Sequence, residues 1–367
     1  MRVKSSGLIL LLLFLSINST EAFGQESIPE AQFISRGTLF ATMYFDTYYM
    51  LQGDALYPGT SEYAMHQKGN AGFTFRRIYL GYDHDFSEKF SGRVVLELKD
   101  ALPLNNGVVS LKAASLTWRD IYPLADLIIG ITSTPTFSVA GSESFWQYRS
   151  VEKTLADMRG IRSSSNTGIR IKGLFNKAET LGYNIMAANA TGSGEENLEH
   201  KIFYLNLWSS LLQRRLYLEI YQDYNKLQAA GSVATTKGFA AWNRPGYTIG
   251  AELAHQLLSQ SGYSGQNISV LGFSAFAHAD IIGDQLRAFA RYDSYDPDRG
   301  FSISHYDPQE SMPFQEHFFL VGLDISLMKN IDLMPNIWIN SYKNKTEGQT
   351  TPATEVAARI TVNILLQ

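Results

Sequence analysis

From about Gly37 to the end of the chain, apolar and polar residues alternate with a period of two. In the last segment, polar or small residues separate five apolar ones, Val356, Ala358, Ile360, Val362 and Ile364. The same alternation recurs at residues 93–99, 169–172, 215–221 and 331–340. Alternation of this kind is typical of β-strands whose two faces meet different surroundings. The chain is therefore expected to consist of many strands.

Fifteen strands can be placed on this pattern, with centres near residues 44, 79, 95, 114, 129, 169, 185, 204, 219, 251, 273, 289, 321, 337 and 360. A sixteenth is predicted over Lys237–Trp242, followed by a turn at residues 243–246. Pro245 and Gly246 are adjacent in this turn, and that pair suits a tight bend of the chain. Sixteen strands are expected, with fourteen and eighteen as alternatives.

The links between these segments alternate between short and long. Short links are expected at 87–89, 119–124, 176–180, 211–214, 281–284 and 328–330, and long links at 51–70, 133–162, 225–235 and 294–316. Aromatic residues also collect beside both kinds of link. Short turns at one end, long loops at the other and two aromatic girdles are features of outer-membrane barrels. The predicted fold is all-β, a transmembrane antiparallel up-and-down β-barrel with both termini in the periplasm.

Composition excludes several other classes of protein. The 367 residues include 18% charged and 13% aromatic residues, no cysteine, and a formal net charge of −4. Repeated apolar runs of ~20 residues, which a helical membrane protein needs, do not occur. The lack of cysteine excludes a disulfide framework, a zinc–thiolate site and a cysteine nucleophile. The negative charge argues against a generic nucleic-acid binder.

The first segment of the chain reads as a secretory signal peptide over residues 1–24. Arg2 and Lys4 precede an apolar run from Leu8 to Leu15, and Ala22 and Gly24 offer small residues for cleavage before residue 25. Cleavage after Ala22 and an uncleaved anchor are the alternatives. Residues 25–36 are then a short periplasmic segment, and residues 37–367 form the outer-membrane barrel.

The long link at 133–162 contains a short helical pattern. Ser150 suits an N-cap, Gly160 suits the end of the helix, and Val151, Leu155 and Met158 share one face. A capped helix in a loop needs a surface to pack on, and the inner wall of the barrel would supply one. Four basic residues of this loop are candidates for the constriction of a channel: Arg149, Lys153, Arg159 and Arg162, with Glu143, Glu152 and Asp157 beside them. The alternative is a loop helix whose charges only keep it hydrated.

The polar faces of the predicted strands carry a balanced set of charges. Nine basic residues are assigned to the lumen, namely Arg77, Arg93, Lys99, Arg170, Lys172, Arg215, Arg287, Arg291 and Arg359. Nine acidic residues share those faces, namely Asp83, Glu97, Glu219, Asp223, Glu252, Asp293, Asp324, Asp332 and Glu355. The count alone predicts no anion channel, but rows such as Arg287 with Arg291 would attract anions locally. The alternative is that these arginines pair with lumenal carboxylates for structural reasons.

The chain resembles the phosphate-selective porin O and P family. The resemblance rests on Phe75–Gly81 with Phe90–Arg93, and on Glu152–Gly160 in the long loop. It implies a sixteen-stranded homotrimeric barrel whose third external loop folds into the lumen, and it implies a preference for phosphate. The chain departs from many outer-membrane barrels at its end, where Leu365, Leu366 and Gln367 stand in place of a terminal aromatic residue.

The function expected is that of an outer-membrane porin, a passive diffusion channel for ions and small polar solutes. A preference for anions or phosphate rests on the resemblance. One alternative is a plugged structural or adhesive barrel in the outer-membrane lipid. Another is an outer-membrane hydrolase, but His255, His278 and His305 have no partner motif of the kind a hydrolase needs. No enzyme activity, cofactor, metal site or nucleic-acid partner is expected.

Overall fold

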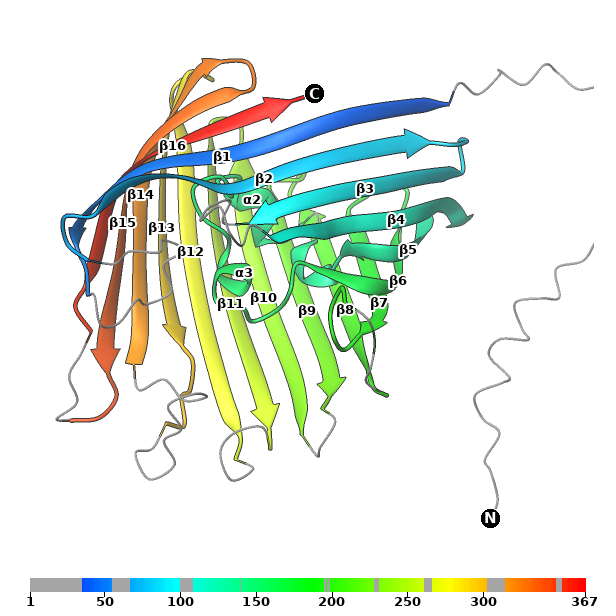
Figure 1. The fold of residues 1–367 in the computed structure, drawn as a ribbon. Helices are drawn as coiled ribbons and strands as arrows, with labels where there is room; N and C mark the ends of the chain where they lie inside the picture. The colour runs from blue at the N-terminus through cyan, green and yellow to red at the C-terminus, as the bar shows by residue number, and fades with distance from the viewer. Residues whose placement is uncertain are drawn as a thin grey trace, which may run out of the picture. The chain divides into compact units, whose positions relative to one another are not determined.

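The computed structural model describes residues 35–54, 67–99, 108–138, 140–194, 196, 199–227, 231–260, 266–301, 314–347 and 352–367. The predicted signal peptide, most of the segment at 25–36 and His305 lie outside these residues. The described chain forms a closed barrel of sixteen antiparallel strands (Figure 1). Each strand pairs with the next one in sequence, and β1 closes the ring against β16. The predicted fold class is confirmed, with sixteen strands.

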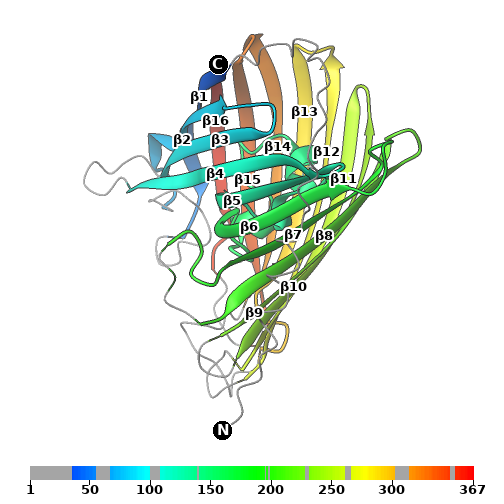
Figure 2. The ribbon, with the colours of Figure 1, turned by 90° about the vertical axis from the view of Figure 1, so that its right-hand side faces the viewer.

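All fifteen segments placed from the pattern lie within strands, and the sixteenth is β10. The strands are β1 (Arg36–Gln52), β2 (Ala71–Asp85), β3 (Phe90–Lys99), β4 (Val108–Tyr122), β5 (Ala125–Ser133), β6 (Ser165–Leu174), β7 (Leu181–Asn189), β8 (Lys201–Leu211), β9 (Leu216–Lys226), β10 (Ser232–Arg244), β11 (Tyr247–Ser259), β12 (Ile268–Ile282), β13 (Leu286–Asp296), β14 (Phe314–Met328), β15 (Ile331–Asn344) and β16 (Glu355–Leu366). Strands β5, β6 and β7 have nine or ten residues and face the viewer in Figure 2, whereas β12 and β14 have 15. The wall is therefore lower on the β5–β7 side.

The links alternate between the two ends of the barrel, as the sequence predicts. Two details of the prediction are wrong. The link expected at 225–235 covers only residues 227–231, because β9 and β10 continue pairing as far as Lys226 and Ser232. The link expected at 119–124 is only Pro123 and Leu124, since β4 runs on to Tyr122. The longest link, residues 134–164, joins β5 to β6.

The two faces of each strand lie in different surroundings. In β16, the side chain of Ile360 is 44% exposed, whereas its neighbour Arg359 is only 3% exposed. Across the strands, the exposed residues are mostly large and apolar, whereas the buried residues of the same strands include many polar and charged ones. An apolar outer face with a polar inner face suits a barrel surrounded by hydrocarbon. Separately, none of the helices among the described residues is long and apolar enough to span a membrane.

The link at 134–164 contains three short helical elements, η1 (Pro135–Phe137), α2 (Ser142–Trp146) and α3 (Leu155–Met158). The helix predicted from Ser150 is wrong in its start, because α3 begins at Leu155 with Thr154 at its N-cap. The turn α2 was not expected. Gly160 follows α3 with a φ of +63°, which agrees with a residue that ends a helix.

Four consecutive carbonyls explain why the predicted helix begins late. The carbonyl oxygens of residues 150, 151, 152 and 153 accept hydrogen bonds from side chains outside this turn, namely those of Arg76, Arg359, Trp146 and Arg291 respectively. A helix that began at Ser150 would need these carbonyls for its own amides. Contacts with distant residues therefore override the local helical preference.

Candidate functional site

An aromatic cluster fixes one side of the long loop to the wall. Phe145, Trp146 and Tyr148 of the loop belong to a buried cluster with the inward-facing Phe239, Phe276, Phe289, Phe318 and Trp338. Trp146 lies 5.5 Å from Phe276 between ring centroids, and Tyr148 stacks on Phe289 at 4.3 Å. Contacts of this type add stabilisation beyond the burial of apolar area. The first half of the loop is therefore packed against β10–β15.

Buried ion pairs continue this attachment along the loop. Arg159 pairs with Glu316 of β14 and donates to Asn340 of β15 at 3.4 Å. Arg162 binds both carboxylate oxygens of Asp223, with Nε at 2.8 Å from one of them. Arg159, Glu316 and Asp223 are buried and Arg162 is partly buried, so removal of the partner of a buried charge would leave that charge uncompensated away from water.

A lysine with two carboxylates holds the start of the loop. Lys237 Nζ lies 2.8 Å from Glu219 and 3.5 Å from Glu252, and it donates to the carbonyl of Thr136 at 2.6 Å. The hydroxyls of Ser138 and Ser142 donate to the same two carboxylates. Loop and wall therefore share one continuous polar network on this side of the barrel.

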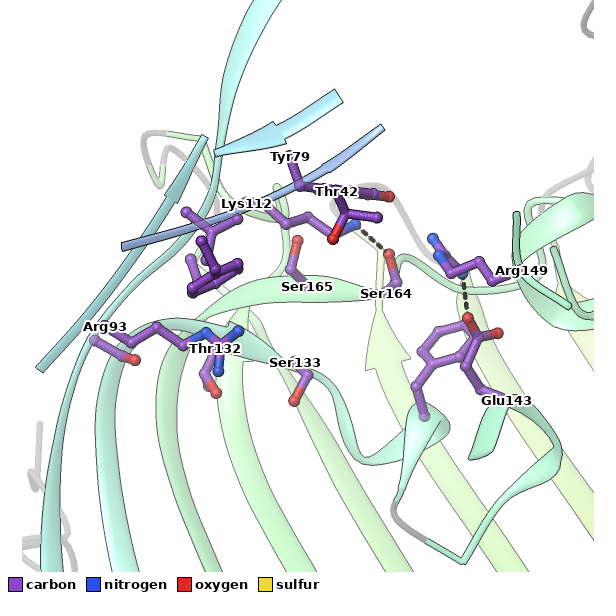
Figure 3. Close-up of a pocket in the computed structure, with 15 residues that line it drawn as sticks. Thr42, Tyr79, Arg93, Lys112, Thr132, Ser133, Glu143, Arg149, Ser164 and Ser165 are labelled. Carbon is purple, nitrogen blue, oxygen red and sulfur yellow. Dashed lines mark hydrogen bonds and ion pairs between the residues drawn. The ribbon is translucent and has the colours of Figure 1, made fainter. Parts of the chain in front are cut away.

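The opposite side of the loop faces an open space. A cavity of about 500 Å³ lies between the loop and the inner faces of β1–β6 (Figure 3). Its lining includes three cations, one carboxylate and several hydroxyls, contributed by Arg93, Lys112, Arg149, Glu143, Thr42, Thr132, Ser133, Ser164 and Ser165. Phe40 and Phe137 add apolar surface. A space lined by charges and hydroxyls favours hydrated ions and polar solutes.

A second, smaller cavity meets the first one. It has a volume of about 150 Å³ and shares Lys112, Arg149, Ser164 and Ser165 with the larger cavity. Its other lining residues include Ser193 in a long link, whereas the larger cavity reaches Arg93 near the start of β3. The two cavities thus extend toward opposite ends of the barrel from one shared set of residues.

A β-bulge brings Lys112 to this shared point. Val95 pairs with Ala113 and Leu96 with Leu111, so Lys112 is the extra residue of β4. A bulge redirects a side chain because it interrupts the alternation of faces. Lys112 Nζ donates to Ser164 at 2.6 Å (Figure 3). It also lies 3.6 Å from Glu97.

Arg149 stands across the shared point, on the loop. Its guanidinium pairs with Glu143 at 2.6 Å and with Asp157 at 2.8 Å. Burial alone would lower the pKa of Arg149, but Glu143, Tyr79 and Asp157 raise it well above its usual value. The guanidinium therefore carries its charge throughout the physiological pH range.

The residues predicted for the site fall into distinct groups. Arg77, Arg93, Arg149 and Lys153 line one or both cavities. Arg159, Arg162, Arg291 and Arg359 instead join the loop to the wall. Arg291 and Arg359 also bind Asp293 and Asn336, which belong to the wall itself.

Four other predicted residues form no hydrogen bond or ion pair with the loop among the described residues. Arg170 is buried and donates to Ser133 and Asn184 within the wall. Lys172 is exposed and Arg287 is partly exposed, and both pair with aspartates, at 3.4 Å to Asp126 and 2.9 Å to Asp280. Arg215 is exposed in the turn before β9, rather than on the inner face of the strand, because the turn takes up residues 212–215. The side chain of Lys99 lies outside the described residues.

Sequence reasoning missed three basic residues of the inner face. Lys112 and Arg76 both stand at bulges, and Arg76 pairs with Asp46 at 2.6 Å. Lys237 lies in the predicted sixteenth strand, whose faces were not assigned from the pattern. A break in the alternation, as at Arg76–Arg77 and Lys112–Ala113, is the signal that could have indicated the bulges. Among the described residues, no group of His, Asp and Glu is placed to hold a metal ion.

Comparison with known proteins identifies the fold but no specific solute or activity. No family model and no curated protein matches the chain. An anion-selective porin from Comamonas acidovorans superimposes with a TM-score of 0.64 at 13% identity, over 91% of this chain and 100% of that one. The outer membrane channel DcaP of Acinetobacter baumannii gives 0.63 at 11% identity, over 90% and 97%. The trimer form of OmpT, an outer membrane protein of Vibrio cholerae, gives 0.58 at 9% identity, over 90% and 99%. The chain therefore shares the sixteen-stranded barrel fold of bacterial outer-membrane porins.

Proposed function

We propose that this protein is an outer-membrane porin that lets ions and small polar solutes diffuse passively, with a preference for anions. The observation that carries the proposal is the pair of cavities that meet at Lys112, Arg149 and Ser164. Their charged and hydroxyl lining suits hydrated solutes, and the apolar outer face of the barrel suits lipid.

The long loop is proposed to set the width of the channel. Its aromatic and ionic contacts with β8–β16 support this role, because they leave it a fixed position relative to the β1–β6 side. The gap between Lys112 and Arg149 would then be the constriction. Solutes would pass between a cation on the wall and a cation on the loop.

The anion preference is proposed from the charge that lines the two cavities. This charge is positive, whereas the charges assigned to the whole lumen from the sequence are balanced. Five basic residues, Arg77, Arg93, Lys112, Arg149 and Lys153, line the two cavities, against the acidic Glu97, Glu143 and Asp157. Excess positive charge in a narrow polar passage raises the local concentration of anions. Guanidinium and hydroxyl groups also suit phosphate oxygens, which supports phosphate as one permeant anion.

The assembly proposed is a homotrimer with both termini in the periplasm. The resemblance of Phe75–Gly81 and Glu152–Gly160 to a trimeric porin family supports it, together with the start of β1 and the end of β16, which both lie at the short-link end of the barrel. Cross-linking of the folded protein, followed by electrophoresis without heating, tests the trimer directly.

The function is tested by reconstitution in a planar bilayer under a salt gradient. Discrete open steps are expected, with a reversal potential of the sign that anion preference requires. Deletion of residues 142–159 should raise the conductance of each step, because it removes the inner side of the constriction. A folded barrel that gives no steps would overturn the porin proposal and favour a plugged barrel. An unchanged conductance in the deletion variant would overturn the role of the loop.

A further inference from the structure

The outer surface of the barrel carries a hollow that the proposed channel does not use. A cavity of about 480 Å³ opens over β11–β15, on the face that carries the exposed apolar residues. Its floor consists of three alanines. Ala277 pairs with Ala290 across β12 and β13, and Ala275 lies two residues further along β12. Side chains this small leave a depression among larger neighbours.

Larger apolar side chains border the alanine floor on both sides. Ile249 of β11 pairs with Ala277 on one side, and Val321 of β14 pairs with Ala290 on the other. At the end nearer the long links, Tyr292 and Phe319 are paired, and their ring centroids are 4.8 Å apart. The hollow is therefore apolar along its length and bounded by aromatic rings at one end.

A polar group of residues lies directly beyond those rings. The hydroxyl of Tyr292 is 2.9 Å from Nδ1 of His317, which precedes Phe319 by two residues on β14. Lys343 of β15 is exposed and pairs in register with Gln315, next to His317 on the same face. Within the described part of the chain, Lys343 forms no ion pair. An exposed ammonium and an imidazole thus stand at the aromatic end of an apolar hollow.

We propose that this hollow binds an acyl chain of a phosphorylated glycolipid, with a phosphate group on Lys343 and His317. Hydrocarbon must fill the hollow in a bilayer, because an empty space would forfeit dispersion contacts. The ring of Tyr292 places the boundary between apolar and polar surroundings at the end of the hollow, where a lipid head group begins. An ammonium and a ring N–H both donate charge-assisted hydrogen bonds to phosphate oxygens.

The choice of a glycolipid rests on the proposed function. An outer-membrane porin turns its long links outward, and the external leaflet of that membrane consists mainly of phosphorylated, multiply acylated glycolipid. Lys343 and His317 lie at the long-link end of their strands, so their head-group partner belongs to that leaflet. A glycerophospholipid of the inner leaflet would present its phosphate at the other end of the hollow.

Native mass spectrometry of the folded full-length barrel in detergent tests the proposal, with diphosphorylated lipid A as the probe. One tight site is expected on the wild-type protein. Ala290→Phe fills the hollow and should weaken binding about tenfold. Lys343→Gln should weaken it about fivefold, since one lysine near an anionic lipid surface contributes on that scale. Ala290→Leu is the smaller replacement if the phenylalanine variant does not fold, as judged by its mobility without heating.

Matched variants elsewhere on the outer face provide the controls. Ala187→Phe enlarges an exposed alanine of β7, and Lys226→Gln removes an exposed lysine at the long-link end of β9. Both should bind lipid A like the wild type. Equal binding of lipid A by the Ala290 and Ala187 variants would show that the hollow is not the binding site. Equally tight binding of dephosphorylated lipid A would overturn the role of Lys343 and His317, and equal competition by phosphatidylglycerol would overturn the glycolipid assignment.

Channel recording separates this inference from the proposed function. Lys343→Gln should conduct like the wild type while losing affinity for lipid A, because Lys343 lies on the outer face. Conducting barrels that show no lipid A site would overturn the lipid inference alone. Silent barrels that retain the site would overturn the porin proposal alone.

Discussion

Lys112 Nζ lies 2.6 Å from Ser164 Oγ, and this hydrogen bond joins a bulge of the wall to the end of the long loop. It places an ammonium group at the point where the two cavities meet. Most other contacts of the loop lie on β9–β16, with Arg76 of β2 also bound to the carbonyl of Ser150, and Lys112 and Arg149 stand on the two sides of the proposed passage.

Lys112→Gln should reduce the preference for anions. Removal of one unit charge at several ångströms from a permeating ion changes its energy by roughly 0.6 kcal/mol in a water-filled passage. Chloride loses this attraction and potassium loses an equal repulsion, so the permeability ratio of chloride to potassium should fall about eightfold, as measured from the reversal potential under a salt gradient. Lys226→Gln, on the outer face, should leave the ratio unchanged. An unaltered ratio in the Lys112 variant would place the constriction elsewhere.

Arg149→His should make the selectivity dependent on pH. The pKa of Arg149 is raised well above its usual value by Glu143, Tyr79 and Asp157 against the opposing effect of burial, so this group does not titrate. An imidazole in its place is charged below its own pKa and neutral above it. The reversal potential of the variant should shift toward less anion preference as the pH rises from 5 to 9, roughly the range in which imidazoles titrate. The contribution of the native guanidinium stays constant over the same range, so equal pH profiles for variant and wild type would contradict the prediction.

Trp146→Ala should weaken the attachment of the loop and the stability of the barrel. Trp146 is fully buried among wall aromatics, and its indole N–H donates to the carbonyl of Glu152 at 2.9 Å. Loss of a buried tryptophan costs about 3–5 kcal/mol of unfolding free energy, measured by denaturant titration of the folded barrel. Trp118→Ala is the matched control, since Trp118 lies on the exposed outer face. Equal losses for the two variants would argue against the buried cluster as the anchor.

A double-mutant cycle on Arg159 and Glu316 should show strong coupling. Arg159→Met or Glu316→Gln alone leaves a buried charge without its partner, and each should cost about 3–5 kcal/mol of unfolding free energy. The double variant should cost less than the sum of the two, because no unpaired charge remains. The exposed pair of Arg214 and Glu179, 3.6 Å apart, should contribute below about 1 kcal/mol in the same measurement. Additive losses at Arg159 and Glu316 would show that the two side chains act independently.

The strands and their facing were predictable from the sequence, because a strand with different surroundings on its two faces must alternate. The pattern at Val356–Ile364 predicted β16 and its outward face correctly, and the alternation of link lengths indicated a barrel. The longest link was identified for the same reason, since it contains no alternation. These features depend on local spacing, which a single sequence displays directly.

The site depended on contacts that local spacing does not record. Arg159 and Arg291 were expected to line the channel, yet both join the loop to the wall. Lys112 was overlooked because a bulge turns it inward against the alternation. The helix expected at Ser150 does not begin there, because Arg76 and Arg359 take the carbonyls it would need.

The sequence by itself therefore predicted about sixteen strands, the outward face of those that alternate regularly and the loop that differs from the others. The tertiary structure alone decided which cations remain beside open space and which are buried in ion pairs. The physical reason is that a strand's facing follows from a period of two along the chain. A charge's role instead follows from partners that lie up to 315 residues away, as Thr361 and Asp46 do.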